Sequence, residues 1–239
     1  MNKINITISN SHVNNNKELN DFSIINFIQN IEGIHINSLF EFNKYLEENN
    51  LGVFLTYREI NIIKRPKLFD NINIDTHPFN TKQISGYRHI YIKDKNNNNL
   101  ITSTAFGVFV NLKTNKIVRI PNEIIKTIND GNKDETMNVS SRKISYNDKL
   151  KETFLLKTNV KRSYIDRYNH MNNSYYIKMV YDLLDENFKY NNIRVEYINA
   201  FNINENINIY LKEKTTNKVI FLLKNDKNIL YSVIEFKKR

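Results

Sequence analysis

Apolar and polar residues alternate along much of this 239-residue chain with the period of two that is typical of half-buried strands. The alternation is clearest at 87–93 and 106–110, and residues 96–99 are expected to form a hairpin turn because asparagine tolerates positive φ. One helical pattern begins at Phe22 and runs towards Ile31. In the first half we predict strands near 53–63, 72–79, 87–93, 101–112 and 116–120.

The second half repeats this plan of a helix and several strands. A polar stretch at 126–148 lacks apolar periodicity and is expected to be a linker. The helix after it has a buried face at three/four spacing, formed by Tyr176, Met179, Val180, Leu183 and Leu184, and is expected to end near Phe188. The strands of this half are predicted near 153–162, 193–201, 207–214, 219–224 and 229–236. Two α+β units with antiparallel sheets are therefore expected.

The segment before the second helix carries an acid and a histidine four residues apart, Asp166 and His170. Asn172 and Asn173 follow, and either can cap the helix by accepting an N–H of its first turn. At a helix N-terminus, unsatisfied N–H groups and the helix dipole favour negative charge. A carboxylate, an imidazole and such a helix end in one turn suit acyl transfer.

This segment resembles the Asp-x-x-x-His-(Val/Met)-Asn-Asn-x-x-Tyr signature of the hotdog-fold thioesterases. More narrowly, it is similar to the second repeat of the fatty acyl–acyl-carrier-protein (acyl-ACP) thioesterases of plants and bacteria. The matching positions are Arg162, Ile165, Asp166, His170, Asn172, Asn173 and Tyr176. Weaker likeness to the N-terminal repeat of that family occurs at 57–66, 75–76, 86–94 and 114–121. The resemblance implies an α+β double hotdog, in which each of two repeats wraps an antiparallel β-sheet around a long helix.

The resemblance also implies domain boundaries and residue roles. The expected N-terminal repeat spans 1–125, the linker 126–148, and the C-terminal repeat, which carries the catalytic motif, 149–239. Asp166 and His170 are the expected catalytic pair, with His170 as the base that activates water. Asn172 and Asn173 are expected to be helix caps whose backbone N–H groups help to line an oxyanion hole.

Three positions need comment against the family pattern. Tyr168 stands where the family has asparagine, so Tyr168 and the neighbouring Asn169 are kept as auxiliary candidates. Ala200 stands where the family has a glutamate tied to catalysis, and strand alternation is expected to place it on the same face as Glu196. A second His-x-Asn-Asn run begins at His12, and we expect it to be a chance likeness that no well-placed helix follows.

Composition excludes several classes of protein and site. Hydrophobic residues make up 40% of the chain, which indicates a globular protein rather than a disordered one. The absence of cysteine excludes disulfides, thiolate metal sites and a cysteine nucleophile. His35, His77 and His89 lack metal-ligand spacing, and no cofactor is expected. The sequence shows neither the apolar core of a signal peptide nor a membrane span, so a cytoplasmic protein is expected.

The formal charge of +10 points to an acidic partner. The densest basic groups are Lys64-Arg65-Pro66-Lys67, Lys157 with Lys161-Arg162, and Lys237-Lys238-Arg239. The acidic acyl carrier protein and its fatty acyl chain are the partners that the resemblance implies. Nucleic acid fits the charge too, but no recognised nucleic-acid motif accompanies it. Codon drift in an AT-rich genome is an equally good explanation of much of the charge.

The expected function is hydrolysis of fatty acyl-ACP thioesters to free fatty acid and the carrier thiol, which ends fatty acid synthesis. An acyl–coenzyme A thioesterase is the nearest alternative. A non-enzymatic alternative, motivated by Ala200, is an acyl-binding or regulatory hotdog protein that has lost the chemistry. Nucleic-acid binding rests on charge alone. The sequence leaves acyl chain length, the choice between carriers and the oligomeric state open.

Overall fold

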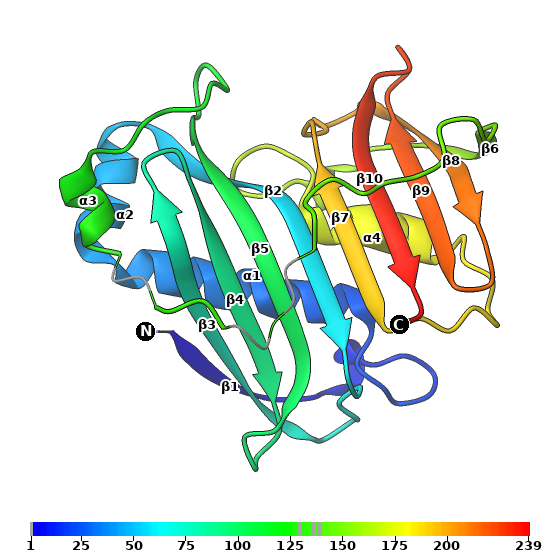
Figure 1. The fold of residues 1–239 in the computed structure, drawn as a ribbon, viewed down its shortest axis with the longest axis horizontal. Coiled ribbons are helices and arrows are strands. Elements are labelled where there is room, and N and C mark those ends of the chain that lie inside the picture. The colour runs from blue at the N-terminus through cyan, green and yellow to red at the C-terminus, as the bar shows by residue number, and fades with distance from the viewer. Residues whose placement is uncertain (1, 129–130, 135–136, 138–139) are drawn as a thin grey trace. The chain divides into compact units, whose positions relative to one another are not determined.

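The computed structural model describes residues 2–128, 131–134, 137 and 140–239 (Figure 1). The chain divides into two compact units, Met1–Ser140 and Ser141–Arg239. Each unit is built from antiparallel strands with few helices. The prediction of an α+β chain dominated by antiparallel sheet is confirmed at this level of detail.

In the first unit the antiparallel strands are ordered β1-β3-β4-β5-β2. Helix α1 packs against β3, because Ile24, Ile28 and Ile31 recur at helical spacing and are fully buried. The elements of this unit are β1 (Lys3–Thr7), the 3₁₀ turn η1 (Asn10–His12), α1 (Asp21–Ser38), α2 (Phe40–Glu48), β2 (Leu51–Ile62), β3 (Asn71–Lys82), β4 (Ser85–Lys93), β5 (Asn99–Asn111) and α3 (Asn122–Lys126).

In the second unit the antiparallel strands are ordered β6-β8-β9-β10-β7. Of the predicted buried face, Tyr176 and Val180 of helix α4 are buried, together with Ile177, whereas Met179 is half-buried and the half-buried Leu183 and Leu184 lie beyond the end of the helix. The elements of this unit are β6 (Thr153–Asn159), the 3₁₀ turn η2 (Arg162–Tyr164), α4 (Asn173–Tyr181), β7 (Asn192–Tyr197), β8 (Asn206–Lys214), β9 (Lys218–Lys224) and β10 (Leu230–Lys237).

The two units follow one order of elements. Each begins with an edge strand and continues through a 3₁₀ turn and a helix to the strand at the opposite edge of its sheet. Three further strands then fill the sheet in the same order, and the first unit adds α2 after its helix. Residues of one unit can therefore be compared with residues at the same structural positions of the other.

The described residues of the predicted linker at 126–148 divide between the two units: those up to Ser140 belong to the first unit, and those from Ser141 belong to the second, where the Ile144 N–H donates to Glu196. The Gly131 N–H donates to the Pro78 carbonyl at 2.9 Å, and the Tyr91 hydroxyl donates to Asp134 at 2.7 Å. The Ser140 hydroxyl donates to a Glu59 carboxylate oxygen at 3.1 Å. Residues 129–130, 135–136 and 138–139 of this predicted linker lie outside the described residues.

Two predictions in the first unit need correction. The helical pattern from Phe22 to Ile31 is too short, because α1 reaches Ser38 and α2 follows it. The predicted strand at 116–120 is wrong, since only an isolated bridge from Ile117 connects it with β5. Pairing with β5 stops after Val118, because the Ile120 N–H donates to the Gln83 carbonyl instead of to a residue of β5. Strand β1 had no counterpart among the predicted strands.

In the second unit the predicted elements near the site are too long. Helix α4 ends at Tyr181 rather than Phe188, because the next N–H groups bond three residues back instead of four. Strand β6 ends at Asn159 rather than at residue 162. Strand β7 ends at Tyr197 rather than at residue 201, because the N–H groups of Ile198 and Asn199 both donate to the Tyr231 carbonyl and interrupt the ladder.

Candidate active site

The segment from Ile165 to Met171, hereafter the signature loop, is a closed turn that leads into α4. Ile165 and Met171 form an isolated β-bridge, and the Asp166 N–H donates to the His170 carbonyl at 2.9 Å. Asn169 has a φ of 61°, a left-handed conformation that asparagine adopts more readily than most residues. The backbone therefore holds Asp166 and His170 directly opposite each other.

The Asp166 carboxylate helps to hold this turn closed. Its Oδ1 accepts the N–H of Tyr168 at 2.8 Å and the N–H of His170 at 3.4 Å. Asp166 and His170 are both half-buried, so each side chain keeps access to solvent. The carboxylate thus fixes the backbone position of the histidine while its negative charge lies beside that residue.

The N-terminus of α4 follows the loop at once. Asn172 is the N-cap residue, and its side-chain oxygen accepts the Ser174 N–H at 2.9 Å and the Ser174 hydroxyl at 2.8 Å. The Asn172 N–H is itself engaged, because it donates to the Tyr164 carbonyl at 2.8 Å. Within the described parts of the chain the Asn173 N–H donates no hydrogen bond. Of the two asparagines, Asn173 therefore offers a backbone donor to a bound oxyanion, and Asn172 provides the cap.

A segment that follows β7 anchors the loop from the other side. The Met171 N–H donates to the Phe201 carbonyl at 2.8 Å. Tyr176 is buried, with 2% of the residue exposed. Its hydroxyl accepts the Phe201 N–H at 3.2 Å and donates to the Asn199 carbonyl at 3.5 Å. Burial raises the pKa of the Tyr176 hydroxyl above its ordinary value, so it stays protonated and can make both bonds. The sequence placed Tyr176 on the buried helix face and in the family signature but predicted no contact for its hydroxyl, although a buried phenol needs such partners.

Ala200 lies between the two residues that Tyr176 holds. Because β7 ends at Tyr197, the predicted strand face shared by Glu196 and Ala200 does not exist. Glu196 instead accepts the backbone N–H of Ile144, and burial raises the pKa of its carboxyl group. Glu205 accepts the Asn202 N–H at 2.9 Å within a turn. Both carboxylates therefore have structural partners of their own.

The two auxiliary candidates have visible roles in the turn. Tyr168 donates its N–H to Asp166, and its hydroxyl accepts a hydrogen bond from the Arg167 guanidinium at 2.8 Å. Asn169 is exposed at the tip and donates its N–H to the Asp166 carbonyl at 3.1 Å. These contacts place both residues in the framework of the loop.

The first unit contains a loop with the same hydrogen bonds, from Val13 to Leu19, which we term the counterpart loop. Val13 and Leu19 form an isolated bridge, as Ile165 and Met171 do. The Asn14 Oδ1 accepts the N–H groups of residues 16 and 18 at 3.0 and 3.1 Å, as Asp166 accepts those of residues 168 and 170. Lys17 has a φ of 61°, the value found at Asn169. Asn20 caps α1 by accepting the Ser23 N–H at 2.8 Å.

The counterpart loop corrects the interpretation of the His-x-Asn-Asn run at His12. Helix α1 does follow this run, but His12 corresponds to Tyr164 rather than to His170. Glu18 occupies the position of His170, and Asp21 the position of Asn173. The sequence signal that could have revealed the loop is the six-residue spacing of Asn14 and Asn20, which matches that of Asp166 and Asn172.

An ion pair between the half-buried Arg65 and the buried Asp21 lies at the N-terminus of α1 in the first unit. Arg65 corresponds to Ala200, because the Leu19 N–H donates to Pro66 as the Met171 N–H donates to Phe201. The Arg65 guanidinium lies 2.8 Å from the Asp21 carboxylate and also donates to the Leu19 carbonyl at 2.8 Å. A long side chain at this position thus reaches the first turn of the helix. At the same position of the second unit, Ala200 leaves the helix end without such an occupant.

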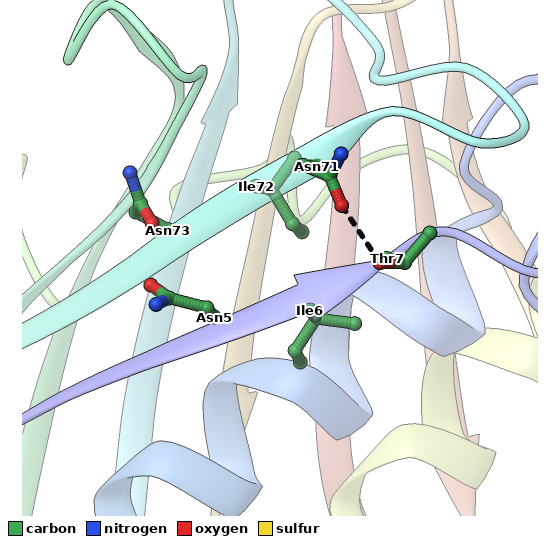
Figure 2. Close-up of a pocket in the computed structure, with 6 residues that line it drawn as sticks. All are labelled: Asn5, Ile6, Thr7, Asn71, Ile72 and Asn73. Atoms are coloured by element: carbon green, nitrogen blue, oxygen red, sulfur yellow. Dashed lines mark hydrogen bonds between the residues drawn. The ribbon is translucent and has the colours of Figure 1, made fainter.

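A pocket of about 300 Å³ lies in the first unit, between β1 and β3 (Figure 2). Its six lining residues are register partners of these strands, Asn5, Ile6, Thr7, Asn71, Ile72 and Asn73. The Thr7 hydroxyl donates to the Asn71 side chain at 2.7 Å. Because neither Asp166 nor His170 lines this pocket, we assign it no part in the reaction.

Two kinds of feature are absent from the described residues. None of the helices within these residues combines the length and the apolarity that crossing a bilayer would require. These residues also contain no group of three or more histidine, cysteine, aspartate or glutamate side chains placed to hold a metal ion.

Solved structures of low sequence identity share the fold of this chain. An acyl-ACP thioesterase from Bacteroides thetaiotaomicron is 17% identical, with a TM-score of 0.81 over 98% of this chain and 96% of that one. The 12:0-ACP thioesterase from Umbellularia californica is 15% identical, with a TM-score of 0.82 over 99% and 96%. A protein described as an oleoyl thioesterase from Lactobacillus plantarum is 16% identical, with a TM-score of 0.84 over 99% and 94%.

Sequence comparison identifies the family. No curated protein sequence matches the chain. The family model for the acyl-ACP thioesterase N-terminal domain, however, matches residues 1–128, and the model for the acyl-ACP thioesterase C-terminal domain matches residues 147–236. Together the two matches take in the counterpart loop and the signature loop. The chain therefore belongs to the acyl-ACP thioesterase family.

Proposed function

We propose that this protein hydrolyses fatty acyl-ACP thioesters to free fatty acid and the carrier thiol, and so ends fatty acid synthesis, with Asp166 and His170 as its catalytic pair. Membership of the acyl-ACP thioesterase family supports the assignment of this reaction. The observation that best supports this site is the hydrogen-bonded Asp166–His170 turn at the N-terminus of α4. The Asn173 N–H, which donates no hydrogen bond within the described residues, follows this turn.

In the proposed reaction His170 takes a proton from a water molecule, whose oxygen attacks the thioester carbonyl carbon. The carbonyl oxygen becomes an oxyanion, which the Asn173 N–H and the positive end of the α4 dipole stabilise. When the tetrahedral intermediate collapses, the C–S bond breaks and the sulfur receives the proton from His170. The Asp166 carboxylate stabilises the transient imidazolium and holds the backbone of residue 170 through the hydrogen bond to its N–H.

We further propose that each unit is one hotdog repeat, with α1 and α4 as the helices around which the two sheets wrap. The proposed boundaries are 1–125 for the first repeat, 126–148 for the linker and 149–239 for the repeat with the catalytic motif. Family matches that end at residue 128 and resume at residue 147 support this division. We also propose a cytoplasmic enzyme whose basic surface binds the acidic carrier.

One observation favours a second candidate, an acyl-binding protein that does not hydrolyse its ligand. Ala200 removes the glutamate expected from the family, and Glu196 and Glu205 are both engaged elsewhere. Turnover separates the two candidates, because a binding protein retains lipid without releasing thiol.

The test is thiol release from acyl-ACP substrates of different chain lengths, with acyl–coenzyme A thioesters in parallel. A thiol-detecting reagent gives no background from the enzyme, which contains no cysteine. We expect turnover on acyl-ACP at a higher kcat/KM than on the matching acyl–coenzyme A. No turnover at any chain length would refute the proposal, and co-purified fatty acid in that case would support the binding protein.

A further inference from the structure

Four cationic side chains lie within the signature loop or on the elements directly before and after it, and we refer to them as the cationic collar: Lys161, Arg162, Arg167 and Lys178. Lys161 and Arg162 precede the loop at η2, Arg167 lies within it, and Lys178 lies on α4. All four are exposed. Within the described parts of the chain, Lys161, Arg162 and Arg167 form no ion pair. The collar therefore presents charge to solvent next to the proposed catalytic pair.

Tyrosine rings hold three of these cations in place. The rings of Tyr164 and Tyr175 stack with their centroids 4.2 Å apart. The Lys161 ammonium lies 5.9 Å from the Tyr164 ring, and the Lys178 ammonium lies 5.8 Å from the Tyr175 ring. Arg167 covers the Tyr168 ring at 4.8 Å. Cation–π contacts restrict these long side chains, so less conformational entropy is lost when a partner binds them.

The counterpart loop provides an internal control for the origin of this charge. The positions that correspond to the collar hold neutral residues, Ser9, Asn10, Asn15 and Asn26. The other charges in the compared segments also differ, because residues 8–28 contain Lys17, Glu18 and Asp21, whereas residues 160–180 contain only Asp166 besides the collar. The net charge is therefore −1 around the counterpart loop and +3 around the signature loop. Codon drift acts on both halves of the chain and does not explain this contrast.

We propose that the cationic collar is the docking surface for the acidic face of the acyl carrier protein. The proposal rests on the proposed function, because it names where the carrier binds at that site. Opposite charges on enzyme and carrier accelerate their encounter and fix the orientation in which the acyl thioester reaches His170. Such attraction between exposed groups weakens as salt shortens the Debye length.

The first unit suggests a variant that preserves the fold. In the collar variant, Lys161→Ser, Arg162→Asn, Arg167→Asn and Lys178→Asn copy the residues that the same backbone carries around the counterpart loop. In the control variant, Lys95→Asn, Lys113→Asn, Lys116→Asn and Lys126→Asn change exposed lysines of the first unit. Each variant loses four positive charges, so both change from +10 to +6 and differ only in where the charge is lost.

The experiment measures kcat and KM for one acyl chain on the carrier protein, on coenzyme A and on N-acetylcysteamine. At low salt we expect the collar variant to raise KM for acyl-ACP about tenfold without changing kcat, and we expect this difference to shrink at high salt. The control variant should match the wild type. Neither variant should change hydrolysis of the small thioester, which lacks a protein carrier.

Three results would overturn the proposal. The first is an unchanged KM for acyl-ACP in the collar variant, and the second is an equal rise in the control variant. The third is an equal rise for acyl–coenzyme A, which would assign the collar to phosphate groups instead of an acidic protein. Fluorescence anisotropy with labelled carrier protein measures docking without turnover. Loss of hydrolysis with collar-dependent binding would therefore refute the proposed function and leave the docking surface intact.

Discussion

The counterpart loop before α1 and the signature loop before α4 are bent by the same set of hydrogen bonds. In each, a short polar side chain, Asn14 or Asp166, accepts the N–H groups two and four residues ahead. In each, an asparagine, Asn20 or Asn172, caps the helix that follows. The shape of the turn therefore depends on these acceptors and not on a histidine.

The two loops differ in the groups that could act on a thioester. Glu18 stands in place of His170, so the counterpart loop has no imidazole. The Arg65–Asp21 ion pair lies at the N-terminus of α1, whereas Ala200 provides no charged side chain at the corresponding position beside α4. One backbone motif therefore provides a framework in the first unit and a candidate reaction site in the second. A few side chains determine whether the motif is a framework or a candidate reaction site.

The largest expected effect comes from copying one residue between the loops. Asp166→Asn introduces the side chain that Asn14 already provides, so the amide oxygen keeps both N–H partners and the loop should stay folded. The lost negative charge should lower kcat by about 10²- to 10⁴-fold. Rates on acyl-ACP and thermal melting curves test this. Asn14→Asp is the matched control and should not change kcat, whereas full activity in Asp166→Asn would show that the carboxylate is not used.

The second prediction concerns two histidines that the first unit buries and the second unit lacks. Burial lowers the pKa of His89 from 6.5 to about 4, and burial together with the neighbouring Arg88 guanidinium lowers the pKa of His35 from 6.5 to about 4. Between these pH values the unfolded chain binds more protons than the folded chain, so stability must fall as the pH drops from 6.5 to 4. The loss should reach about 3 kcal/mol for each histidine.

Urea unfolding at pH 7 and pH 4.5, followed by hydrogen exchange in the strands of each unit, measures this effect. The first unit should lose protection before the second. His89→Gln should flatten part of the pH dependence, because its side chain does not titrate. Equal stability at the two pH values would contradict the burial of neutral imidazoles in the first unit.

The third prediction tests whether the open position at Ala200 limits the rate. Because Arg65 reaches the first turn of α1 from the corresponding position, Ala200→Glu should bring a carboxylate to the first turn of α4. If this carboxylate positions water or supports His170, kcat should rise up to about 10²-fold. Ala200→Gln has a similar size without the charge and should give no rise. An unchanged kcat in Ala200→Glu would assign the carboxylate role to Asp166 alone.

The smallest expected effects concern the two caps. Asn20→Ala and Asn172→Ala each remove a side-chain acceptor from a helix N-terminus, and each should lower the free energy of unfolding by about 1 kcal/mol. Only Asn172→Ala should also lower kcat, because only α4 has its N-terminus at the proposed oxyanion site. Denaturation curves and rates on acyl-ACP check both parts. A matching loss of rate in Asn20→Ala would contradict the division of roles between the loops.

The sequence predicted most strands of both sheets, since an antiparallel strand with one buried face leaves a period of two. It also predicted where Asp166 and His170 lie, because their spacing and the following cap belong to one local turn. The other features of the site depend on tertiary contacts, which the sequence pattern does not reveal. The place of Ala200 depends on Phe201, whose hydrogen bonds to Met171 and Tyr176 connect residues far apart in sequence. The sequence does not reveal the counterpart loop, because this loop shares the hydrogen-bond acceptors and the helix cap of the signature loop but not its catalytic residue types.

The central claim is that catalysis belongs to the signature loop and not to its counterpart. The most direct measurement is kcat on one acyl-ACP substrate for the wild type, His170→Ala and Glu18→Ala, which truncate the same structural position in the two units. We expect kcat to fall by about 10²- to 10⁴-fold in His170→Ala and to stay unchanged in Glu18→Ala. Wild-type turnover in a folded His170→Ala protein, or an equal loss in both variants, would contradict it.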